Sequence, residues 1–125
     1  MISVVDTSVL IDHSRGLPAA RDILRKAAAE SALHSSEIVR AELLVLIRDA
    51  ERSGIEPLLD VIVWHPVDRQ VAELAGELGR RWLPAFTGID AADFVIAATT
   101  MLLDGRLLTR NVKHFPMIEG LQAPY

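Results

Sequence analysis

The chain has 125 residues, of which 50% are hydrophobic and 24% charged, a composition typical of one globular domain and not of a disordered chain. The absence of cysteine excludes disulfides and thiolate metal sites, and no run of about 20 apolar residues is present to span a bilayer. The formal net charge of -4 argues against broad electrostatic coating of nucleic acid, and since no basic, apolar leader is seen we expect a soluble, cytoplasmic protein that does not engage membranes.

The first feature along the chain is a β-branched apolar run over residues 2–11, interrupted by Asp6, Thr7 and Ser8. A run that is apolar on both faces predicts a central parallel strand covered by helices on both sides. Ile2, Val4 and Asp6 share one face of such a strand, so Asp6 points inward. Because burying an unpaired ionised carboxylate is costly, we expect a cation opposite Asp6.

The remaining segments alternate between helical and strand patterns. The predicted elements are a helix over 19–32, a strand over 33–36, a helix over 37–51 ended by Gly54, a helical turn over 57–60, a strand over 61–65, helices over 67–82 and from Asp90 to about 103, a strand over 107–109, and an edge strand around Leu121. This alternation predicts an α/β fold with right-handed crossovers around a central parallel sheet of four to five strands. Asp6, Ser35 and Asn111 all fall at carboxyl ends of strands, where such sheets place their functional crevice.

Glu42 is the least expected residue on its helix. The residues three and four positions away on either side are all apolar: Ile38, Val39, Val45 and Leu46. Because these spacings share a helix face, Glu42 is predicted to project from the buried stripe. Two interpretations stay open, a core glutamate paired with an arginine and a metal ligand.

Asp90 and Asp93 lie three apart at a predicted helix start, where they can form a capping box as readily as a catalytic pair. The apolar segment 94–98 favours the catalytic reading for Asp93, because it makes this helix buried nearly all round. Asp6 can alternatively cap its own turn through Thr7 or Ser8, and Asn111 can be a turn residue.

Several carboxylates in one crevice would repel each other by about 4 kcal/mol per pair at ~4 Å and moderate dielectric, so they require a countercharge. Hard oxygen ligands without close histidine or cysteine spacings favour Mg²⁺ or Mn²⁺ over zinc. Ions held in this way are commonly used for phosphodiester hydrolysis.

Four motifs then occur in one order: Val5-Asp6-Thr7-Ser8-Val9-Leu10-Ile11, Arg40-Ala41-Glu42-Leu43, residues 93–99 (Asp-Phe-Val-Ile-Ala-Ala-Thr), and residues 108–115 (Leu-Thr-Arg-Asn-Val-Lys-His-Phe). Together they resemble the PIN-domain family, specifically the VapC-type toxin ribonucleases of toxin–antitoxin pairs. The resemblance covers essentially the whole chain and implies a single PIN-like domain over 1–125, a three-layer sandwich with a central parallel sheet flanked by helices.

The resemblance also implies an activity, a cofactor and partners. The activity is a Mg²⁺- or Mn²⁺-dependent endoribonuclease, the toxin of a type II toxin–antitoxin system, which forms a homodimer and is neutralised by a cognate VapB-type antitoxin. By position, Asp6, Glu42 and Asp93 match the three core acids of the family, and Asp90 is an accessory acid. Asn111 stands where many members carry a fourth acid, which predicts weaker binding of a second metal.

The expected mechanism is attack of an activated water on an RNA phosphodiester. The metal ligands are expected to be Asp6, Glu42, Asp90 and Asp93, with Asn111 contributing to catalysis. Thr7, Ser8 and Thr109 are expected to orient the ligands, and the predicted RNA-binding residues are Arg15, Arg110, Lys113 and His114. Single-stranded or loop RNA is the expected substrate, since a narrow cleft does not read paired bases.

Two alternatives remain open at this stage. Asp6 followed by Thr7 is compatible with an aspartate-nucleophile phosphoryl-transfer enzyme, although no second acid follows two residues later. The chain can also be an interaction module that has kept the fold with weakened catalysis.

Overall fold

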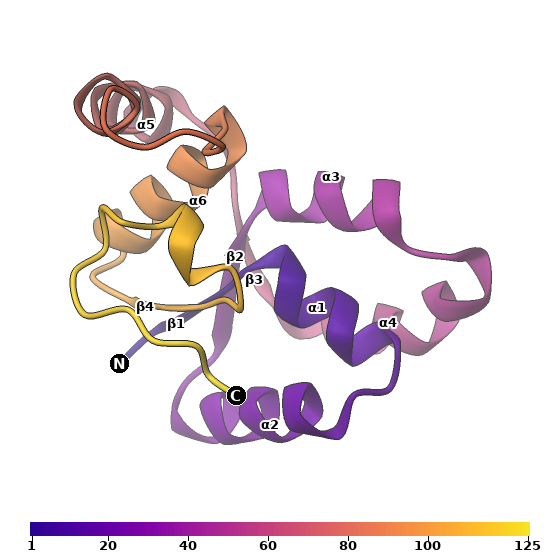
Figure 1. Ribbon diagram of the computed structural model, residues 1–125. Coiled ribbons are helices and arrows are strands. Elements are labelled where there is room, and N and C mark those ends of the chain that lie inside the picture. The colour runs from indigo at the N-terminus through magenta and orange to yellow at the C-terminus, as the bar shows by residue number, and fades with distance from the viewer.

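Four parallel strands form the centre of the molecule, in the order β3-β2-β1-β4 (Figure 1). The computed structural model describes residues 1–125. The strands are short: β1 (Ser3–Val5), β2 (Leu33–Ser36), β3 (Val63–His65) and β4 (Arg106–Leu108). The register pairs Val4 of β1 with His34 on one side and with Leu107 on the other. The predicted α/β sandwich around a parallel sheet is therefore confirmed, with four strands.

Helices cover both faces of this sheet. They are α1 (Thr7–Ser14), α2 (Pro18–Glu30), α3 (Glu37–Leu46), α4 (Asp49–Val61), α5 (Arg69–Trp82) and α6 (Ala91–Leu102), followed by a short 3₁₀ turn, η1 (Val112–His114). Figure 1 shows α5 and α6 on one side of the sheet and α1, α2 and α4 on the other, with α3 extending away from the sheet above α1. None of these helices combines the length and apolarity needed to cross a membrane.

The central strand is apolar on both faces because both faces are covered. Val4 and Val5 are fully buried, and they pack in a core that includes Leu24 of α2, Ile55 of α4 and Phe94 of α6. These side chains come from helices on both faces of the sheet, so the hydrophobic core lies on both sides of the sheet.

Only residues 3–5 of the amino-terminal run form a strand. β1 ends at Val5, Asp6 adopts an extended conformation at φ -83° and ψ 160°, and α1 begins at Thr7. A short apolar run without clear periodicity is compatible with either structure, and Val9 and Leu10 are buried as one face of a helix. The consequence is that Asp6 occupies a strand-to-helix junction.

The predicted carboxyl-terminal boundary of the helix over 37–51 is also wrong. The helix α3 stops at Leu46, because Ile47 is extended at ψ 141°, and α4 then runs through Gly54 without a break. A new helix start is stabilised at Arg48, whose N–H donates to Glu51 Oε1 at 3.0 Å. Gly54 therefore ends no helix, and the predicted turn over 57–60 belongs to α4.

The remaining boundaries differ at the ends of elements. The helix α4 extends to Val61, so β3 begins only at Val63, and α5 begins at Arg69 with Asp68 accepting the N–H of Val71 at 3.0 Å. No strand forms around Leu121, where Gly120 has a φ of +71° that interrupts an extended run.

Candidate active site

A polar cavity of about 270 Å³ opens at the carboxyl ends of β1 and β4. Its lining is formed by Asp6, Thr7, Ser8, Ile11, Glu42, Leu46, Asp90, Asp93, Arg110, Asn111 and His114. All four predicted metal ligands are in this set, although they come from different parts of the chain. The sheet and its flanking helices thus bring together the acids that the sequence separates.

Hydroxyl groups, and no basic side chain, hold Asp6. Its side chain is almost inaccessible, since the residue is only 4% exposed. Thr109 Oγ1 donates to Asp6 Oδ2 at 2.6 Å and Ser8 Oγ donates to the same oxygen at 3.0 Å. No lysine or arginine forms an ion pair with Asp6. No basic side chain therefore supplies the expected countercharge, and two hydroxyl donors stabilise the carboxylate. A metal ion as the countercharge stays a prediction.

Glu42 reaches the cavity from α3 and also has no basic partner. Thr7 Oγ1 donates to Glu42 Oε1 at 2.9 Å. Burial raises the pKa of Glu42, the hydrogen bond from Thr7 lowers it, and the charges of Asp6 and Asp90 raise it further. The arginine-paired reading of Glu42 is thus wrong, and its pKa direction records a carboxylate that lacks a countercharge.

The helix α3 is not buried around Glu42 on all sides. Val39 is fully buried, whereas Val45 is 82% and Leu46 57% exposed. The apolar stripe predicted from the sequence therefore enters the core only at its amino-terminal end. Its carboxyl-terminal end stands in solvent, where Leu46 forms part of the cavity wall.

Asp90 and Asp93 form the capping box that was one of the two interpretations left open by the sequence. They form a reciprocal cap, in which Asp90 Oδ1 accepts the Asp93 N–H at 3.0 Å and Asp93 Oδ2 accepts the Asp90 N–H at 3.2 Å. Both also line the cavity. Burial raises the pKa of Asp93 to about 6, an effect that the Asp90 backbone and the His114 ring oppose and the Asp90 and Asp6 charges reinforce.

The residues after β4 complete the rim. The Asn111 N–H donates to Thr109 Oγ1 at 3.0 Å, which places Asn111 in the lining. His114 Nδ1 lies 3.4 Å from Asp93 Oδ2. Lys113 and Arg15, both predicted to contact RNA, lie outside the lining, and Arg15 is instead 3.6 Å from Glu51.

Two sequence observations do not lead to the cavity. Ser35 is buried inside the sheet, where its Oγ donates to the Val5 carbonyl at 2.7 Å. The histidines show no close spacing in sequence, but His34 Nδ1 and His65 Nε2 meet at 2.8 Å across β2 and β3. This pair is not in the cavity lining.

The chemistry of the donor atoms suits a hard divalent cation, but their present positions do not. The four carboxylates and Asn111 offer oxygen ligands only. No three histidine, aspartate or glutamate side chains stand close enough together to hold one ion as they are. Binding would therefore require side-chain rotation, above all of Asp90 and Asp93, whose oxygens are engaged in the helix cap.

Sequence reasoning missed four residues around this cavity. Ile11 and Leu46 form its apolar wall, while Asp12 contacts Arg110 from outside and Tyr125 contacts Asp12. A helical reading of residues 7–14 would have found Ile11, because it lies four positions after Thr7 on the same helix face. Nothing in the sequence links Tyr125 to Asp12.

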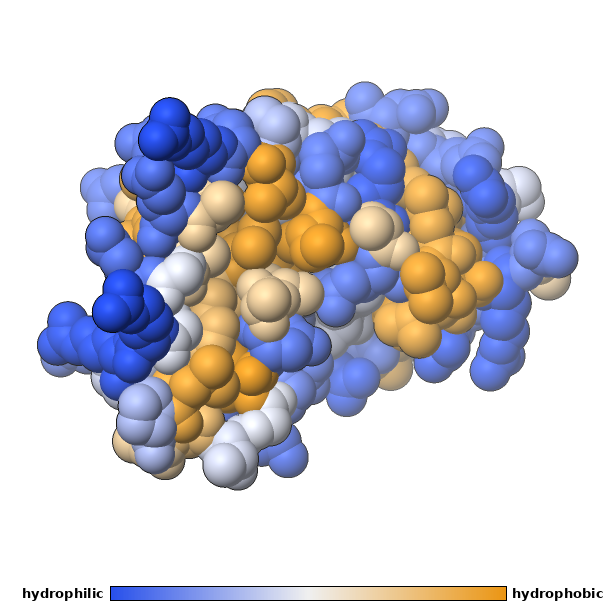
Figure 2. All heavy atoms as spheres, turned by 90° about the horizontal axis from the view of Figure 1, so that it is seen from above, coloured by the Kyte–Doolittle hydropathy of each residue, from blue (hydrophilic) through white to orange (hydrophobic).

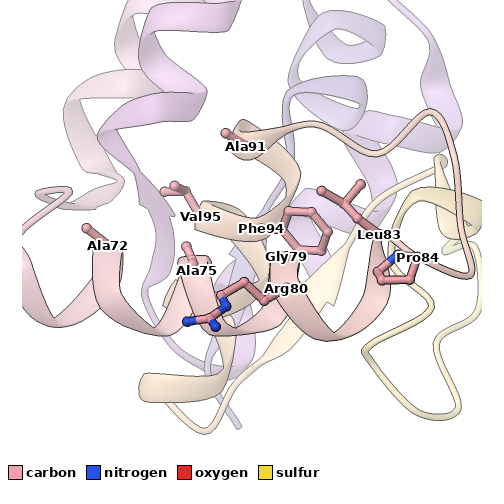
Figure 3. A pocket seen from close by; sticks show the side chains of 10 residues that line it. Ala72, Ala75, Gly79, Arg80, Leu83, Pro84, Ala91, Phe94 and Val95 are labelled. Carbon is pink, nitrogen blue, oxygen red and sulfur yellow. The ribbon is translucent and has the colours of Figure 1, made fainter.

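A larger hollow lies between α5 and α6 and has a different character. Figure 3 shows Phe94 beside Leu83 and Pro84, with Ala75 of α5 facing Val95 of α6, in a groove of about 790 Å³. It contains no carboxylate and a single arginine, Arg80. Figure 2 looks down on this face of the molecule and shows apolar surface on both sides of hydrophilic side chains. The larger hollow therefore lacks the acids that make the smaller cavity the candidate site.

The PIN domain matches residues 3–119. The chain belongs to the PIN-domain family. Two curated relatives in this family are from Mycobacterium tuberculosis. Ribonuclease VapC19 is 40% identical over 125 residues, which cover 99% of this chain and all of the relative. Ribonuclease VapC10 is 40% identical over 122 residues, which cover 98% of this chain and 92% of the relative. Within the PIN-domain family the chain therefore groups with the VapC ribonucleases.

Solved PIN-fold structures agree with this membership. A toxin–antitoxin complex from Klebsiella pneumoniae contains a chain that superimposes with a TM-score of 0.81 at 26% identity, covering 98% of both chains. VapBC2 from Rickettsia felis, bound to a DNA fragment from its promoter, gives a TM-score of 0.81 at 21% identity, covering 98% of this chain and 97% of that one. The second likeness supports the fold alone.

Proposed function

We propose that this PIN-domain protein is a Mg²⁺- or Mn²⁺-dependent endoribonuclease. The observation that carries the proposal is a cavity lined by four carboxylates, none of which forms an ion pair with a lysine or arginine. Such an arrangement is electrostatically unfavourable by itself: burial raises the pKa of Glu42 and of Asp93, and the charges of the neighbouring acids raise both further. A divalent cation would remove it.

Asp6, Glu42 and Asp93 are the proposed metal ligands, with Asp90 and Asn111 contributing directly or through water. The bound ion would act as a Lewis acid that activates water and offsets phosphate charge. The chain's own part is to fix the acids: Thr109 and Ser8 orient Asp6, and Thr7 orients Glu42. Because these hydroxyls occupy one oxygen of each carboxylate, the other oxygen stays free to bind.

The RNA backbone would be positioned at the rim of the cavity. Arg110 and His114 line it, so they are placed to contact a phosphate next to the carboxylates. Lys113 and Arg15 can contribute only to a longer stretch of backbone outside the cavity. Its volume of about 270 Å³ admits no double helix, which favours single-stranded or loop RNA.

The relatives supply the biological setting of the proposal. Two are named ribonucleases of the VapC group, and solved structures of this fold are complexes with an antitoxin. We extend both properties to this chain, as the toxin of a type II toxin–antitoxin pair with a VapB-type antitoxin as its partner. A homodimer remains an expectation from the family resemblance.

The deciding experiment is cleavage of a fluorescently labelled single-stranded RNA by purified protein. We expect cleavage with Mg²⁺ or Mn²⁺, none with EDTA, and a loss of at least about 100-fold in Asp6→Asn, a group on which metal binding depends. The matched control is Asp22→Asn, a charge removal at a side chain that is 68% exposed on α2. Cleavage by Asp6→Asn at the rate of the control would refute the proposal.

A further inference from the structure

Arg110 is the only lysine or arginine in the lining of the acidic cavity, yet it is bound to an acid outside it. Its Nε lies 2.5 Å from Asp12 Oδ2, and its Nη2 donates to Asp12 Oδ1 at 3.1 Å. Asp12 sits on α1 with its side chain only 13% exposed. This two-point contact fixes the plane of the guanidinium.

Asp12 has a second partner, Tyr125, which contacts the same oxygen as Arg110 Nε. The Tyr125 hydroxyl donates to Asp12 Oδ2 at 2.6 Å. Burial and the nearby Asp12 carboxylate raise the pKa of Tyr125, so the hydroxyl keeps its proton and remains a donor. Tyr125 and Arg110 together give the Asp12 carboxylate three contacts, which restrict its rotation.

This arrangement separates Arg110 from charges that would attract it. The cavity holds Asp6, Glu42, Asp90 and Asp93, and Arg110 is within ion-pair distance of none of them. A guanidinium released from Asp12 would be drawn to these carboxylates, since opposite charges attract strongly in a partly buried site. Once there, it would compete with a cation for the same oxygens.

We propose that Asp12, braced by Tyr125, is a positioning residue that keeps Arg110 at the rim and out of the acidic cavity. This inference rests on the proposed function, because it assigns the cavity to a divalent cation. With Nε and Nη2 held by Asp12, the guanidinium keeps Nη1 free for an RNA phosphate. One arginine then serves the substrate without displacing the metal.

The test is Mn²⁺ binding, measured by calorimetry without RNA, in a double-mutant cycle of Asp12→Asn and Arg110→Ala. We expect Asp12→Asn to weaken Mn²⁺ binding about tenfold. In the Arg110→Ala background the same substitution should change the affinity less than twofold, because no guanidinium is left to enter the cavity. Tyr125→Phe should weaken binding by a smaller factor, and Asp22→Asn should have no effect.

The cycle separates positioning from simple charge. If Asp12→Asn acts only by removing a nearby negative charge, it will weaken Mn²⁺ binding by the same factor with and without Arg110, and the proposal is overturned. A crystal structure of metal-free Asp12→Asn gives an independent readout. We expect the Arg110 guanidinium within 4 Å of a cavity carboxylate, and a guanidinium still at the rim would overturn the proposal.

The crystal structure of Asp12→Asn also distinguishes a failure of the proposed function from a failure of the proposal about Asp12. A wild-type protein that binds no Mn²⁺ and cleaves no RNA would refute the proposed function. The position of Arg110 in the Asp12→Asn crystal would still decide whether Asp12 restrains it.

Discussion

The substitution Asp93→Asn should stabilise the folded protein near neutral pH while abolishing its activity. Asp93 is nearly buried, with a side chain 13% exposed, and shares the cavity with three other carboxylates. Asparagine has almost the same shape, carries no charge, and keeps an oxygen that can accept the Asp90 N–H. The variant therefore removes the unfavourable charge and retains the helix cap.

The magnitude follows from the pKa. A rise from 3.8 to about 6 on folding corresponds to about 3 kcal/mol, at 1.36 kcal/mol per unit. Because the pKa is higher in the folded state, the stabilisation from protonated Asp93 is complete below pH 3.8 and is lost as the pH rises through 6. Losing the acidic charge at the helix start costs about 0.3–1 kcal/mol. We expect a net gain of about 2–3 kcal/mol at pH 7.5.

Urea unfolding in the presence of EDTA measures this difference. The wild-type free energy of unfolding should fall between pH 4 and pH 7.5, and Asp93→Asn should exceed it by a clearly larger margin at the higher pH. Asp22→Asn, at an exposed side chain, should stay within about 0.5 kcal/mol of wild type at both. An Asp93→Asn variant that is destabilised equally at the two pH values would refute the reasoning, because it would show that the ionised Asp93 carboxylate does not destabilise the folded protein.

Three further predictions concern the same region. Mn²⁺ at 100 times its dissociation constant should raise the free energy of unfolding by about 2.7 kcal/mol, and the thermal shift should vanish in Asp6→Asn. Thr109→Val removes the 2.6 Å hydrogen bond to Asp6 and should cost about 1–3 kcal/mol in urea unfolding, whereas an unchanged midpoint would mean that Ser8 suffices. Leu43→Ala should cost about 2–5 kcal/mol because Leu43 is fully buried, while Val45→Ser, at an 82% exposed position on the same helix, should stay within about 0.5 kcal/mol.

The sequence predicts most of the architecture because the alternation of strands and helices is strong. It fails at junctions. Residues 7–14 form α1 instead of continuing β1, since a short apolar run does not distinguish the two structures and tertiary packing decides. The break after Leu46 is equally hidden, because residues on both sides of it have helical spacing.

The candidate site is predicted more completely than its surroundings. The acids Asp6, Glu42, Asp90 and Asp93 are found because carboxylates at strand ends and on apolar helix faces are unexpected, and the structure brings all four to one cavity. Their roles in catalysis remain predictions. The contacts around Arg110 lie beyond sequence reasoning, because Asp12 and Tyr125 are 113 positions apart and share no local pattern.

The hydrogen bond between Asp6 and Thr109 spans 103 positions of the chain, and it has a consequence for biosynthesis. No local fragment contains the whole cavity, so a nascent chain emerging from the ribosome would not complete it until β4 has joined the sheet beside β1. Because the cavity needs β4 beside β1, we expect any substitution that detaches β4 to disrupt the cavity, however far it lies from the carboxylates.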